Sequence, residues 1–169
     1  MKIKQVLSAL EQFAPLPLQE SWDNAGLQVG LTEAEVSGAL LCLDVNEKIV
    51  DEAIAKGCNL IVSHHPLLFR GLKQISGVND VQRTVIKAIK HDIVVISMHT
   101  NMDNARDGVN WKIAEKLGLM NIQFLSPLTN NPSPSLVVSR TETGQRTELC
   151  AALCHQSHQK RYRHRFHAH

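Results

Sequence analysis

The stretch Leu60-Ile61-Val62-Ser63-His64-His65-Pro66 joins a short apolar run to two adjacent histidines. A run of this length, bounded by polar residues, is typical of a strand buried within a sheet. Similar runs occupy residues 39–43 and 93–96. The first of them, Ala-Leu-Leu-Cys-Leu, has the unbroken apolar character expected of a strand covered on both faces.

Amphipathic segments separate these strands. Apolar residues recur at helical spacing over residues 3–14, 49–54, 81–89 and 109–117. Asn46 is expected to cap the second of these helices, and Asn79 or Asp80 the third. Residues 15–30 are predicted to form a loop. Strands that alternate with helices pair in parallel through right-handed crossovers, so the sequence predicts a three-layer α/β fold with a mainly parallel sheet and helices on both faces.

The pattern weakens beyond residue 128. A fourth strand over 122–124 and one more over 136–138 are possible from their apolar residues. We expect an α/β metal-binding domain over 1–128 with an incomplete second lobe, and a linker or partial strand over 129–148. Residues 149–169 show no hydrophobic period and hold five of the nine histidines, so we expect a disordered basic tail there.

Composition and charge exclude several classes of protein. The chain is 43% hydrophobic and has no apolar run near the roughly 20 residues that a membrane span needs. Of its 18 basic residues, four follow Glu148 and no acidic residue does, which leaves 14 basic against 16 acidic residues over 1–148. This mildly acidic part makes nucleic acid an unlikely partner. The polar N-terminus, with no apolar stretch of a secretion signal, favours a cytoplasmic protein.

Five polar residues follow the predicted strands. Asp44 ends the first strand, His64 and His65 follow the second, and His99 and Asp103 follow the third. The carboxyl ends of parallel strands lie at one edge of a sheet, where ligand sites of open α/β proteins form. We therefore expect these side chains to converge.

Imidazole and carboxylate groups from neighbouring loops suit a divalent cation. Adjacent residues of an extended segment point different ways, so His64 and His65 fit two different ions better than one, with Asp103 as the bridge between them. Such a pair of ions would polarise a substrate oxygen and generate hydroxide near neutral pH. A double histidine before a proline is also common on surfaces, and Asp44 suits helix capping or an outer hydrogen bond better than coordination.

The sequence resembles the Nif-three-like family of GTP cyclohydrolase I type 2 homologues. Three motifs carry the resemblance, which runs over about residues 1–128: residues 21–30 (SWDNAGLQVG), 63–69 (SHHPLLF) and 99–103 (HTNMD). The resemblance implies that His64, His65 and Asp103 bind two divalent metals, and that His99 lines the same site. It also implies the N-terminal lobe of a two-lobed α/β fold that assembles into a ring-shaped homohexamer.

One departure from the family concerns a further His and Glu, four residues apart, which the second half of a typical member supplies. No His-x-x-x-Glu follows residue 110 here. We expect a truncated or frame-shifted C-terminal part, an incomplete metal site and an apolar sheet face left uncovered. For the same reason ring assembly is in doubt for this chain.

Two functions remain open at this stage. The first is a metal-dependent hydrolase of the cyclohydrolase kind, with His99 in acid–base catalysis because its reference pKa lies near 6.5. The second is a non-enzymatic metal-binding scaffold or regulatory partner protein. Zinc, manganese, iron and nickel all suit the expected ligands, and the sequence does not identify a small-molecule substrate.

Overall fold

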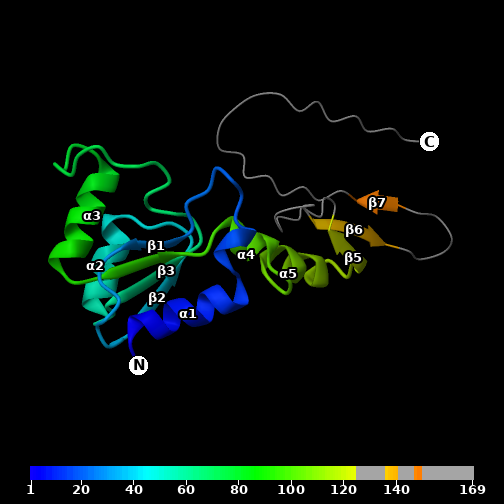
Figure 1. Ribbon diagram of the computed structural model, residues 1–169, viewed down its shortest axis with the longest axis horizontal. Coiled ribbons are helices and arrows are strands. Elements are labelled where there is room, and N and C mark those ends of the chain that lie inside the picture. Colours follow the sequence, from blue (N-terminus) through cyan, green and yellow to red (C-terminus); the bar gives the residue numbers. More distant parts are fainter. Residues whose placement is uncertain (125–135, 141–146, 150–169) are drawn as a thin grey trace.

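The computed structural model describes residues 1–124, 136–140 and 147–149. Its larger sheet has four strands in the order β1-β4-β3-β2 (Figure 1). Their bounds are β1 (Gly26–Val29), β2 (Ala39–Cys42), β3 (Leu60–Ser63) and β4 (Val94–Ser97). β2, β3 and β4 are parallel, whereas β1 is antiparallel to β4.

Helices cover both faces of this sheet, as Figure 1 shows. One face packs on α1 (Ile3–Phe13), and the other on α2 (Glu47–Ala55) and α3 (Asp80–Lys90). Alternate residues of the central strands serve the two faces: Leu60 and Val94 lie in the cluster with α1, while Ile61 lies in the cluster with α2 and α3. The predicted three-layer α/β fold with a mainly parallel sheet is thereby confirmed.

The helix starts follow from two asparagines. The Asn46 side chain accepts hydrogen bonds from the backbone of Lys48 and Ile49 at 3.0 and 3.1 Å. Asn79, rather than Asp80, caps α3 by accepting from the Gln82 backbone at 2.9 Å. These bonds satisfy backbone N–H groups that have no partner within the helix, so both helices begin where the sequence predicts.

The prediction of a loop over residues 15–30 was wrong. This segment contains a short 3-10 helix, η1 (Leu16–Leu18), and the antiparallel strand β1. A strand of only four residues with an irregular register has too few alternating apolar and polar residues to be detected from the sequence. Gly30 follows it at φ +97°, where a Cβ would lie 2.9 Å from a Val94 methyl group. Glycine is thus needed there for backbone angle and for close packing.

The prediction that residues 39–43 are covered on both faces was also wrong. β2 is an edge strand of the sheet, and Leu41 and Leu43 are 76% and 59% exposed. Leu41 pairs with Val62 on the face that α1 covers elsewhere. An unpaired strand edge with exposed leucines is a template for association.

Replacing Leu41 and Leu43 together by lysine is expected to reduce self-association of the chain without lowering its melting temperature, because both side chains are already exposed. Sedimentation velocity over a range of concentrations measures this, with Leu31→Lys as the control. Leu31 is 85% exposed but lies outside the edge strand. Unchanged association of the double variant would contradict the prediction.

The remaining elements follow β4. They are α4 (Thr100–Asn104), α5 (Val109–Lys116) and the antiparallel strands β5 (Met120–Phe124), β6 (Leu136–Arg140) and β7 (Thr147–Leu149). Strands therefore form where 122–124 and 136–138 suggested them. The prediction of a linker or partial strand over 129–148 concerns residues that are mostly outside those described. Residues 150–169 of the predicted tail also lie outside them. No helix in the described ranges is long and apolar enough to cross a bilayer.

Candidate metal centre

The two adjacent histidines lie in the turn after β3, and sheet-like hydrogen bonds hold that turn. The His64 and His65 backbone N–H groups donate to the carbonyls of Cys42 and Leu43 at 3.2 and 2.9 Å. Their carbonyls accept from serine hydroxyls, His64 from Ser97 at 2.8 Å and His65 from Ser63 at 2.9 Å. All four backbone groups are thus hydrogen-bonded, which fixes the backbone positions from which the two imidazole side chains extend.

The second turn follows β4 and carries His99 at the start of α4. The Met98 N–H donates to the Ser63 carbonyl at 2.8 Å, and the Asp103 N–H donates to the His99 carbonyl at 3.1 Å. Gly108 lies against this short helix, and a Cβ there would overlap the Met102 carbonyl oxygen. A side chain at position 108 would therefore displace the α4 turn that carries Asp103.

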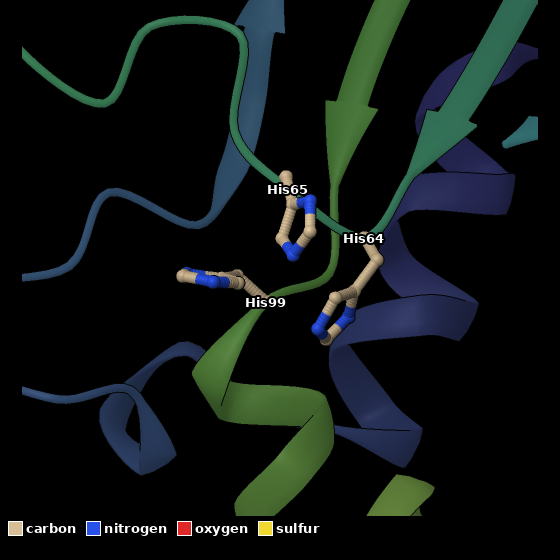
Figure 2. A group of neighbouring side chains, drawn as sticks. All are labelled: His64, His65 and His99. Atoms are coloured by element: carbon tan, nitrogen blue, oxygen red, sulfur yellow. The ribbon is translucent and has the colours of Figure 1, made fainter. Parts of the chain in front are cut away.

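Three imidazoles from these turns meet in one place (Figure 2). His64, His65 and His99 each offer a ring nitrogen, and the three atoms lie within 4.8 Å of one another. The ring centroids of His64 and His65 are 5.0 Å apart, and those of His64 and His99 are 5.2 Å apart. Within the described residues this is a group that could hold a metal ion.

The Nδ1 atom of each ring makes a hydrogen bond that orients it. The partners are the Met98 carbonyl for His64 at 3.0 Å, the Asp44 carboxylate for His65 at 2.7 Å and the Asp23 carboxylate for His99 at 2.8 Å. Metal-binding histidines characteristically donate their second N–H to a carbonyl or carboxylate. With Nδ1 engaged in this way, Nε2 of each ring is the nitrogen left to face a cation or a substrate.

Asp23 is the residue that sequence reasoning missed. Its side chain is fully buried, and it accepts from the Thr100 backbone at 3.1 Å and from the Thr100 hydroxyl, in addition to its bond with His99. Burial alone would raise the pKa of Asp23, but these bonds and one from the Asn24 backbone outweigh it and hold that pKa below the ordinary carboxyl value. A buried carboxylate thus fixes the His99 ring.

Asp103 lies beside the histidine group. Its Oδ1 is 3.8 Å from His64 Nε2, and both side chains are mostly buried. Burial lowers the pKa of His64, and the nearby charge of Asp103 opposes that shift only in part. His64 therefore stays neutral, as coordination requires, further into the acid range than an exposed histidine.

The structure brings together every site residue that the sequence singled out. His64, His65 and His99 form the compact group, Asp103 adjoins it through His64, and Asp44 contacts His65. Asp44 does not cap α2, because Asn46 does. The hydrogen bond between Asp44 and His65 Nδ1 fits the outer role that the sequence favoured over coordination.

The Asp44→Asn substitution is expected to lower the affinity for zinc about tenfold, since outer partners of metal-binding histidines contribute factors of this order. Asn retains the shape of the side chain but not the charge that favours a polarised imidazole. Equilibrium dialysis with metal analysis measures the change. Asp51→Asn, an exposed carboxylate on α2 paired with Lys87, is the matched control. Equal affinities of the two variants would contradict the prediction.

Fold and site together define an α/β protein with a candidate metal centre at the carboxyl ends of the parallel strands in a mainly parallel sheet. The chain belongs to the Duf34/NIF3 (NGG1p interacting factor 3) family, whose model matches residues 1–165. This match extends beyond residue 128, at about which the resemblance seen in the sequence ends.

Individual relatives agree with this assignment. The chain is 43% identical over 126 residues to a GTP cyclohydrolase 1 type 2 homolog of Staphylococcus aureus (strain MRSA252), covering 75% of this chain and 34% of the relative. It thus spans about a third of that protein's length.

Solved structures show the same fold. A Bacillus cereus protein related to NIF3 superposes with a TM-score of 0.70 at 41% identity, covering 76% of this chain and 35% of the other. Reduced HcgD from Methanocaldococcus jannaschii gives a TM-score of 0.71 at 31% identity, covering 82% of this chain and 54% of the other.

Proposed function

We propose that this chain supplies part of a dinuclear site for divalent metals that serves a hydrolytic reaction. The observation that carries the proposal is the meeting of three imidazoles, each oriented through Nδ1, at the end of the sheet. The donor set fits a borderline cation such as zinc, manganese, iron or nickel. His64 and His65 would be ligands, and Asp103, 3.8 Å from His64, would bridge to the second ion.

Bound cations would supply Lewis acidity, polarising a substrate oxygen and lowering the pKa of water. The protein's own part is orientation and proton transfer. His99 is the group that we assign to proton transfer, because its ring lies against those of His64 and His65 at 5.2 and 5.6 Å. Asp23 fixes its Nδ1 side, so Nε2 is the atom that would exchange a proton with substrate.

The reaction class rests on the relatives. The Staphylococcus aureus relative is named a GTP cyclohydrolase 1 type 2 homolog, and hydrolytic opening of a ring is the most specific reaction that we extend to this chain. Such a step needs an electrophilic carbon near the cations and a proton donor beside the leaving nitrogen. His64 and His65 would hold the cations next to that carbon, and His99 would be the proton donor.

Turnover of the purified chain on esters, phosphates and nucleotides, with and without a chelator, tests this function. We expect chelator-sensitive hydrolysis that His65→Ala abolishes. His99→Gln should retain metal but lose turnover, and loss of metal instead would make His99 a ligand. Metal binding without turnover on the whole panel would favour a non-enzymatic scaffold.

The number of ions is measured separately by metal analysis after dialysis. Because no further His and Glu pair at the family's spacing follows residue 110, we expect the ions to be lost on prolonged dialysis against chelator-free buffer. Two ions retained by every chain would contradict an incomplete site.

A further inference from the structure

Two exposed aromatic side chains lie beside the histidine group, and the proposed metal chemistry uses neither. Trp22 is 55% exposed and Phe69 is 44% exposed. Their ring centroids are 6.0 Å apart with the planes tilted by 59°. Each ring also meets His99 edge to face, Trp22 at 6.2 Å and Phe69 at 6.5 Å. The pair therefore forms a wall, the Trp22/Phe69 wall, directly against the candidate metal centre.

The loop that carries Phe69 is held in place. Both backbone groups of the preceding Leu68 are bonded to side chains of the segment that follows Trp22. The Leu68 carbonyl accepts from Asn24 Nδ2 at 2.6 Å, and its N–H donates to Oε1 of Gln28, in β1, at 3.0 Å. Gln28 also donates to the Asn24 carbonyl at 2.7 Å. These bonds tie the Phe69 loop to Asn24 and to β1, so the backbone beside Phe69 is held in place although its ring is exposed.

Trp22 is anchored by the residue that follows it. Asp23 is buried and bonded to His99 and Thr100, which fixes the backbone on which the indole stands. Two large rings are thus presented to solvent on rigid supports. Exposed aromatic groups that are held beside a polar site are typical of ligand binding rather than of folding.

Resting on the proposed metal function, we propose that the Trp22/Phe69 wall binds a planar aromatic or heteroaromatic ring of the substrate. Aromatic rings prefer offset stacking or edge-to-face contact at centroid distances of about 4.5–7 Å. The tilt between Trp22 and Phe69 lets one planar ring stack on the first and meet the edge of the second. Since both rings already contact His99, a polar substituent on a ring bound there reaches the histidines.

A purely protective role makes a different prediction. If Trp22 and Phe69 only shelter His99 from water, their removal would change the surroundings of His99 but would not affect the preference for flat over saturated rings. Ring preference therefore separates the two roles.

The test uses two probes, benzoate and cyclohexanecarboxylate, which share a charge, a size and a metal-binding carboxylate but differ in planarity. Binding to the full chain is measured by NMR titration, with and without zinc, after metal analysis of each sample. We expect benzoate to bind about three- to tenfold more tightly, the range that aromatic contacts provide. Trp22→Ala and Phe69→Ala should lose this preference. Trp22→Phe should keep it, as should the control Leu31→Ala.

Equal binding of the two probes by the unsubstituted chain would overturn the inference, and so would a preference that survives both alanine substitutions. Zinc binding without ring preference would support the proposed metal site and contradict the proposed role of the Trp22/Phe69 wall. Ring preference in a chain that binds no zinc would support the wall and contradict the metal site. Circular dichroism checks each fold, and Trp22→Leu or Phe69→Leu replaces the corresponding alanine variant if that variant does not fold.

Discussion

Replacing His64 and His65 together by alanine is expected to abolish binding of divalent metal at micromolar concentrations. The substitution removes two of the three imidazoles of the group and leaves only His99 with the adjoining Asp103. Loss of a ligand should cost more than the roughly 10- to 100-fold in affinity that loss of an outer partner costs. Two losses should bring binding below detection by equilibrium dialysis with metal analysis.

The matched control is His91→Ala. His91 is an exposed histidine at the end of α3, so this variant removes an imidazole without touching the strand ends. Its zinc binding should equal that of the unsubstituted chain. Full zinc binding by the double variant would show that the ions sit elsewhere and would end the proposal of a metal site at this sheet edge.

The Asp23→Ala substitution is expected to reduce the free energy of unfolding by about 3 kcal/mol, the range observed when one partner of a buried, hydrogen-bonded charge is removed. It leaves the Thr100 N–H, the Thr100 hydroxyl and His99 Nδ1 without their acceptor. Denaturant titration measures the change. Asp51→Ala, an exposed carboxylate, should change stability by less than about 0.5 kcal/mol.

The effect of Asp23→Ala should also depend on pH. The pKa of Asp23 is lowered in the folded chain, so its carboxylate stabilises the fold fully above the unfolded pKa of about 4 and loses that contribution as the pH falls through the folded value. The gap in stability between the variant and the unsubstituted chain should therefore narrow below about pH 4. A gap that widens in acid would contradict the assignment.

The convergence of the site was predictable because it follows from parallel pairing. His64 and Asp103 lie 39 positions apart in the sequence, yet their atoms come within 3.8 Å because both follow the ends of neighbouring parallel strands. The same reasoning could not find Asp23. That residue lies in a segment taken as a loop, and its bonds reach across more than 70 positions. Its only signal was membership of the motif at residues 21–30.

The exposure of Leu41 shows a second limit. Its apolar run has the composition of a covered strand, but cover is decided by strand order and by how far α1 extends, which are properties of the assembled fold. β1 was missed for a related reason. Its pairing with β4 depends on contacts with residues such as Ser97 and Ile96, which are distant in the chain.

The hydrogen-bonded turn at His64 and His65 should influence which metal ions the protein binds. Both N–H groups and both carbonyls of these residues are already hydrogen-bonded. The backbone that carries the two imidazoles is therefore held against movement when an ion binds. A group of imidazole nitrogens favours borderline transition-metal ions over hard ions that prefer oxygen ligands. Calcium, a large ion that takes six to eight oxygen ligands at roughly 2.3–2.6 Å, should be rejected even in large excess over a first-row transition metal.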